Sequence, residues 1–220
     1  MTARGSIVLA GAPPVIPFAV PRLPRMPLFS FEGRFPQVHP EAWVAPTATL
    51  VGDVVVEAGA SIWYGAVLRA DFGPIVIRAG ANIQDNSVLH GGSDPATEIG
   101  PGATVGHMCV VHGAVVGAEA LIGNGATVQD GARIGRRSLI GAHSLVPPGA
   151  QIPDEVLALG TPARVRGPLS DGAAGWVDGN PSIYQELARR HAAGIEEVRP
   201  SHSPGRPDGL HDPLTMEPRA

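Results

Sequence analysis

The sequence predicts an all-β solenoid, a parallel β-helix of about seven triangular coils followed by a C-terminal α-helix. Two observations lead to this fold class. Aliphatic residues recur at every sixth position over residues 38–165, and glycine or another small residue follows many of them. A period of six matches neither the 3.6-residue repeat of an amphipathic helix nor the two-residue repeat of a half-buried strand. It is typical of hexapeptide-repeat solenoids.

The most regular run of aliphatic residues begins in the middle of the chain. It consists of Val110, Val116, Ile122, Val128, Ile134, Ile140, Val146 and Ile152. Each hexad supplies a short strand and a turn, and three hexads close one coil of about 18 residues. Because the aliphatic side chain of each hexad points into the prism, we expect Val116, Ile122, Val128, Ile134 and Ile140 to be buried.

Composition agrees with this fold and excludes several chemistries. Apolar residues make up 44% of the chain and aromatic residues only 5%, so the core must consist of small aliphatic side chains. All 16 basic residues are arginine, which excludes a lysine Schiff base and a phosphate-loop lysine. The net charge of −4 indicates neither a nucleic-acid nor a membrane partner. A single cysteine, Cys109, excludes an internal disulfide and indicates a reducing, cytoplasmic location.

Other segments flank the predicted β-helix domain, to which we assign residues 31–168. Residues 1–30 are rich in proline and residues 198–220 lack periodicity, so both are expected to be disordered extensions. Residues 169–197 are expected to form a polar link and an amphipathic helix. We expect this helix over residues 182–197, with Ser182 as its N-cap.

Two interruptions of the repeat indicate a functional site. The hexads break at residues 69–74 and at 90–98, and three histidines surround the second break: His90, His107 and His112. Because His90 and His107 are 17 residues apart, close to one coil, we expect them on neighbouring coils, with His112 one face further round. Three imidazoles on an accessible edge would form a zinc site whose bound water has a pKa of about 7. The alternative is three unrelated histidines on the outer surface.

The chain resembles the γ-class carbonic anhydrase family over residues 31–195. The resemblance rests on SIWYGAVLRADFGPIVIRAGANIQDNSVLH, VGHMCVVHGAVVG, GAHSLVPPG and LGTPARVRG, which follow one another in this order. Hexapeptide acyltransferases share the repeat but not this set of motifs. The resemblance implies a left-handed β-helix, a homotrimer and a zinc ion, with iron or cobalt as other metals that three imidazoles accept.

The resemblance implies a metal site shared between subunits. His90 and His112 would come from one chain and His107 from its neighbour. The implied activity is the reversible hydration of carbon dioxide to bicarbonate by a zinc-bound hydroxide. Cys109 lies two residues from His107, and it is either a fourth ligand or a small buried filler.

Further residues match the surroundings of the metal in that family. Arg69 and Asp71 match the charged pair beside the metal, and Arg69 would also reach Asp85 across the trimer interface. Gln84 matches the amide that orients metal-bound water, and Asn82 matches a second polar neighbour.

The C-terminal helix and the two breaks of the repeat also bear on this resemblance. The C-terminal helix could bring Tyr184 toward the site. The chain also departs from the family pattern, because Phe72 stands where active members carry a glutamate and the loop at 90–98 is short.

These departures leave two alternative functions open. One is a hexapeptide-repeat acyl or CoA-thioester enzyme that uses one histidine and a cleft between coils, and the other is a metal-binding relative without turnover.

Overall fold

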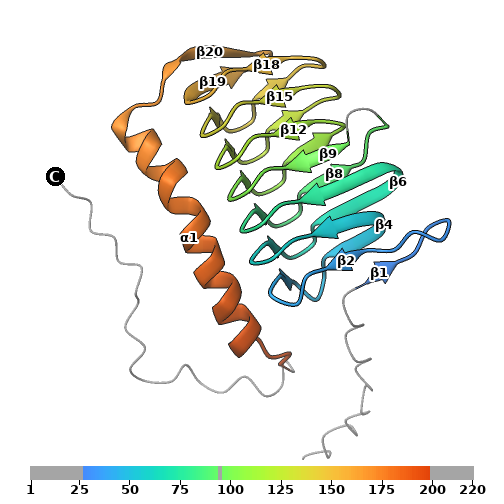
Figure 1. The fold of residues 1–220 in the computed structure, drawn as a ribbon. Coiled ribbons are helices and arrows are strands. Elements are labelled where there is room, and N and C mark those ends of the chain that lie inside the picture. The colour runs from blue at the N-terminus through green and yellow to red at the C-terminus, as the bar shows by residue number, and fades with distance from the viewer. Residues whose placement is uncertain (1–26, 94–95, 199–220) are drawn as a thin grey trace, which may run out of the picture.

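The structure is a computed structural model that describes residues 27–93 and 96–198. It is a left-handed parallel β-helix with a single helix alongside, as the sequence predicts (Figure 1). Most of the predicted N- and C-terminal extensions lies outside the described residues. The ordered solenoid begins before residue 31, because strand β1 (Leu28–Phe29) pairs with β4 (Thr49–Val56).

The first sheet has 12 strands and supplies two faces of the prism. The long strands β4 and β6 serve both faces, since the first part of β6 pairs with β8 and its last part with β9. The strands of this sheet are β1, β2 (Gln37–Val38), β4, β6 (Val67–Ile77), β8 (Val88–His90), β9 (Thr97–Ile99), β11 (Val110–His112), β12 (Val115–Val116), β14 (Thr127–Val128), β15 (Arg133–Ile134), β17 (Leu145–Val146) and β18 (Gln151–Ile152).

The second sheet has eight strands and forms the third face. Its strands pair in parallel from coil to coil, except that the last two are antiparallel and close the end of the solenoid. They are β3 (Trp43–Val44), β5 (Ser61–Ile62), β7 (Asn82–Ile83), β10 (Thr104–Val105), β13 (Leu121–Ile122), β16 (Leu139–Ile140), β19 (Val156–Gly160) and β20 (Ala163–Pro168).

The interior of the prism confirms the predicted core. Val116, Ile122, Val128 and Ile140 are completely buried, and Ile134 is 3% exposed. Full burial of an aliphatic side chain of this size contributes about 1.5–3 kcal/mol to folding. Because every coil adds such side chains, the stacked coils share one continuous core.

The C-terminal helix α1 (Asp171–Gly194) begins earlier than the sequence predicts. Ser170 is its N-cap and accepts a hydrogen bond from the backbone of Ala173, whereas the Ser182 hydroxyl donates to the Gly179 carbonyl inside the helix. The first half of the helix is rich in glycine, a poor helix former. Packing against the solenoid offsets this cost, since Val177 is 1% exposed. Within the described residues, no helix is long and apolar enough to cross a bilayer.

Helix α1 lies along the eight-stranded sheet and packs most closely against β3, β5 and β7 (Figure 1). At that end, the His191 ring lies between aromatic rings, and its Nδ1 is 2.8 Å from the Tyr64 hydroxyl. Nearer its start, Asp178 binds the Arg137 guanidinium through two hydrogen bonds of 2.8 Å. The helix is therefore held at two separate points, over different coils.

Candidate active site

Each histidine of the predicted trio is bound by an aspartate. One ring nitrogen of each faces a carboxylate oxygen, and the other nitrogen is bound by no carboxylate. The three pairs are His90 Nε2–Asp71 Oδ1 at 3.0 Å, His107 Nδ1–Asp85 Oδ2 at 2.9 Å and His112 Nδ1–Asp130 Oδ1 at 2.7 Å. The carboxylates thus fix the orientation and tautomer of all three rings.

His90 and His112 lie against each other at the ends of two neighbouring strands, β8 and β11, of the 12-stranded sheet. They are paired residues in the register of β8 and β11, and their ring centroids are 4.7 Å apart. His90 Nδ1 and His112 Nε2, the nitrogens that no aspartate binds, are 2.8 Å apart. This is the distance of a hydrogen bond between the two rings. A metal ion that replaced the shared proton would contact both nitrogens.

His107 lies apart from this pair, so the coil arithmetic predicted the wrong neighbour. His90 stacks on His112, 22 residues away, because the break after His90 lengthens that coil beyond 18 residues. His107 follows β10 of the other sheet. Within the described residues, no group of three or more possible metal ligands gathers in one chain.

Asp71 bridges Arg69 and His90. It forms an ion pair with Arg69 Nη1 and binds His90 through its second oxygen. The hydrogen bond with His90, followed by the interaction with Arg69, lowers the pKa of Asp71. The neighbouring Phe72 is 73% exposed. The predicted contact of Arg69 with Asp85 of another subunit stays a prediction, and within the chain Asp85 binds His107.

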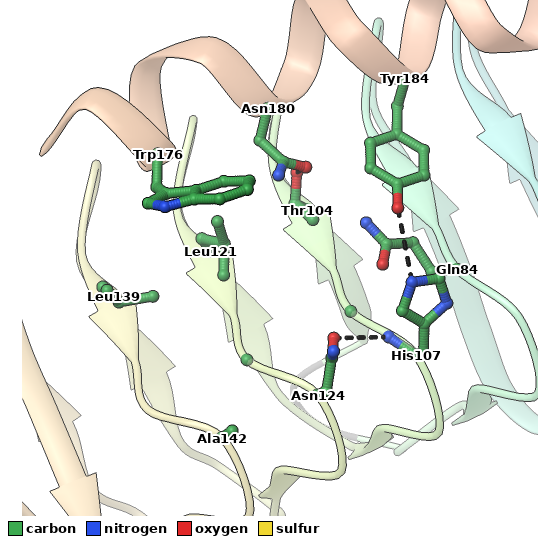
Figure 2. Close-up of a pocket in the computed structure, with 12 residues that line it drawn as sticks. Gln84, Thr104, His107, Leu121, Asn124, Leu139, Ala142, Trp176, Asn180 and Tyr184 are labelled. Carbon is green, nitrogen blue, oxygen red and sulfur yellow. Dashed lines mark hydrogen bonds between the residues drawn. The ribbon is translucent and has the colours of Figure 1, made fainter. Parts of the chain in front are cut away.

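His107 faces the C-terminal helix through its free nitrogen. The Tyr184 hydroxyl lies 3.5 Å from His107 Nε2, and the His107 backbone N–H donates to Asn124 Oδ1 at 3.1 Å (Figure 2). Burial, and then the negative charge of Asp85, raises the pKa of Tyr184, so this hydroxyl stays protonated and can donate. Helix α1 thus brings Tyr184 to the site, as expected, while its role stays a prediction.

A buried chain of hydrogen bonds holds the two predicted amides. Gln84 Nε2 donates to Asn82 Oδ1 at 3.1 Å, and Asn82 Nδ2 donates to Thr104 Oγ1 at 2.8 Å. Thr104 in turn donates to Asn180 Oδ1 of helix α1 at 3.1 Å. Asn82 is therefore engaged in this structural network, whereas Gln84 also lines the cavity beside His107.

An open groove of about 400 Å³ runs from His107 along the eight-stranded sheet beneath helix α1. Its His107 end is polar and its far end is apolar (Figure 2). The polar end consists of Gln84, Thr104, His107, Asn124, Asn180 and Tyr184, and the apolar end of Leu121, Leu139, Ala142 and Trp176. A groove of this size and character suits a small organic ligand.

Sequence reasoning missed several residues of the site. Asp130 follows His112 by 18 residues, one coil, so the repeat itself could have indicated their contact. Trp176 and Asn180 were missed because the helix was expected to begin at Ser182. No signal in the sequence singles out Asn124.

Cys109 is a buried filler. It is completely buried, its Sγ lies 3.2 Å from the Gly123 carbonyl oxygen, and burial raises the pKa of its thiol to about 11. The thiolate, which is the form that binds metals, is therefore disfavoured at neutral pH.

Comparison with known proteins identifies the family. Residues 113–148 match the family described as bacterial transferase hexapeptide (six repeats). The carnitine operon protein CaiE of Escherichia coli O157:H7 is 42% identical over 175 residues, which cover 80% of this chain and 89% of that protein. The chain belongs to the CaiE-like family of hexapeptide-repeat proteins. CaiE of Salmonella typhimurium is 41% identical over a segment of the same length.

Solved structures support the same assignment. The CaiE-like chain matches a candidate acetyltransferase from Bacillus cereus with a TM-score of 0.75 and 32% identity, covering 77% of this chain and 98% of the other. A hexapeptide transferase family protein from Anaplasma phagocytophilum gives a TM-score of 0.71 and 34% identity, covering 74% and 96%. The predicted left-handed, γ-class-like hexapeptide fold is thus confirmed. The name of the Bacillus cereus structure refers to acetyl transfer and that of the Anaplasma structure to a transferase, and neither refers to hydration.

Proposed function

We propose that the protein is an acyltransferase that takes its acyl group from a coenzyme A thioester, with His107 as the general base. The observation that carries the proposal is the Asp85–His107 pair at the polar end of the groove. Asp85 accepts the Nδ1 proton at 2.9 Å, which leaves Nε2 as a proton acceptor facing the groove. The names of the Bacillus cereus and Anaplasma relatives support a transferase.

The proposed reaction is a direct acyl transfer. The amine or hydroxyl of an acceptor attacks the thioester carbonyl, a new C–N or C–O bond forms, and the C–S bond breaks. The proton of the acceptor passes to His107 Nε2 and then to the departing thiolate, so that the products are the acylated acceptor and the coenzyme A thiol. The protonated Tyr184 hydroxyl is a suitable donor to the carbonyl oxygen as it gains negative charge.

Thiol release tests this function. Acetyl-CoA is mixed with the full-length protein and a panel of amines and sugar hydroxyls, and free thiol is followed with a thiol-reactive dye. We expect release that depends on the acceptor and persists in a chelator, because no step needs a metal. Cys109 is buried and contributes little background. Thiol release at the rate of buffer alone with every acceptor would refute the proposal.

Metal-dependent hydration of carbon dioxide is the second candidate, and the His90–His112 geometry favours it. The two free nitrogens converge, and Asp71 and Asp130 hold the outer nitrogens, an arrangement typical of zinc-binding histidines. In a homotrimer, His107 of a neighbouring subunit would complete the ligand set. Zinc held there would supply hydroxide at neutral pH. Phe72 cannot carry the released proton, so this reaction would depend on buffer.

The two candidate functions use His107 Nε2 in incompatible ways, because a metal bound to this nitrogen would prevent His107 from acting as a base. For the hydratase, we expect a trimer with one zinc, iron or cobalt ion per chain, and we expect His112→Ala to lose the metal. Metal analysis and sedimentation of the purified protein measure both. A matched control is His143→Asn, an exposed turn residue with a φ of 55° that asparagine tolerates. A metal-free trimer without hydration activity would eliminate this candidate.

A further inference from the structure

We propose that the apolar end of the groove binds the acyl chain of the donor, so that the preferred substrates are linear acyl-CoA thioesters of about six to eight carbons. The inference rests on the proposed acyl transfer and specifies its substrate class. Its basis is the continuous apolar surface of Leu121, Leu139, Ala142 and Trp176 beside the polar end that contains His107.

The floor of the groove changes character along one column of the sheet. Thr104, Leu121 and Leu139 occupy matching positions in consecutive coils, because β10 pairs with β13 and β13 pairs with β16. Thr104 is engaged by its hydrogen bonds with Asn82 and Asn180, whereas the two leucines are only partly buried. A partly exposed apolar column next to a candidate base favours an apolar ligand.

The roof of the groove is helix α1 where it lies over the later coils. The helix packs most closely against β3, β5 and β7, and nearer its start Trp176 extends over Leu121 and Leu139 (Figure 2). Trp176 is 62% exposed. Among the described residues that line the groove, only His107 and Tyr184 are titratable, so no charge opposes entry of an alkyl chain.

The spacing of the coils sets the length of chain that fits. Paired strands lie about 4.8 Å apart, so the two steps from the coil of His107 to that of Leu139 span about 10 Å. An extended alkyl chain advances roughly 1.3 Å per carbon, which gives six to eight carbons. The volume of about 400 Å³ accommodates such a chain.

Binding of S-alkyl-CoA thioethers, which cannot transfer a group, tests the groove without turnover. Calorimetry with methyl, butyl, hexyl, octyl and dodecyl thioethers should show affinity rising about three- to fourfold per methylene up to octyl and no further. Leu139→Trp should weaken octyl binding at least tenfold and leave methyl binding unchanged, because the new side chain fills only the far end. Trp176→Ala should flatten the dependence on chain length.

The control variants introduce the same new residues, tryptophan and alanine, at exposed positions outside the groove. Val165→Trp lies on β20 and Ile183→Ala on the exposed side of α1, and both should bind all thioethers like the unmodified protein. Affinity independent of chain length would overturn the inference, even if acetyl transfer is observed. If Leu139→Trp weakens methyl and octyl binding equally, the coenzyme A arm occupies the groove and the inference is wrong. Length-dependent binding without any transfer would keep the groove assignment and refute the acyltransferase function.

Discussion

Replacing Asp85 with asparagine should lower acyl transfer by about 10²- to 10⁴-fold, and His107→Ala should lower it at least as much. The Asp85 carboxylate only accepts hydrogen bonds and therefore holds the proton of His107 on Nδ1. An asparagine amide can donate instead, which moves the proton to Nε2 and removes the base from the groove. Steady-state rates with an acyl-CoA donor and its best acceptor measure this loss.

The effect of Asp85→Asn should fall on kcat rather than on KM, because Asp85 is not among the residues that line the groove. The melting temperature serves as the check on folding. The same substitution at Asp130 separates the two candidate functions, since Asp130 binds His112 and not His107. A metal site would lose about 10- to 100-fold in metal affinity from either variant. Equal losses of acyl transfer in both variants would contradict His107 as the base.

The solenoid could be predicted from the sequence because one simple constraint repeats. Each hexad must place an aliphatic side chain in the prism, and Ile122 and Ile140 are buried for that reason. Local exceptions could not be predicted in the same way. The residues after His90 lengthen one coil, so His112 rather than His107 became its neighbour. Counting with a fixed period fails wherever an insertion lies between the residues compared.

The predicted start of the helix was wrong for a different reason. Three glycines precede Pro181 in the helix, and they disfavour a helix on local propensity alone. Burial of Val177 and the Asp178–Arg137 interaction stabilise that half of α1, and neither contact is visible in the sequence. Trp176 consequently entered the site only through the tertiary structure. Residue types indicated which side chains could carry chemistry, while packing determined the shape of the groove.

Gly91→Ala should destabilise the fold strongly and separate His90 from His112. A Cβ on Gly91 would overlap the backbone carbonyl of Gly73, and one on Gly73 would overlap that of Gly92. Both obstacles are backbone atoms, so the strands must move apart, at a cost of about 1–3 kcal/mol. For a domain of this size, that cost lowers the melting temperature by roughly 2–4 °C per kcal/mol. Thermal unfolding followed by circular dichroism measures the change.

The location of Gly91 makes the functional effect of its substitution selective. Gly91 follows His90 directly, and its N–H donates to the Arg69 carbonyl at 3.0 Å, which ties the loop to β6. A displaced loop should move His90 away from His112 and lower any metal content. His107, which follows β10 of the other sheet, should keep its contact with Asp85. Gly172→Ala is the control, because no atom lies within 4 Å of its Cβ position. In a helix, that change should stabilise by up to about 1 kcal/mol. An unchanged melting temperature for Gly91→Ala would mean that the loop accommodates the methyl group at little cost. In that case the loop is not what holds His90 against His112.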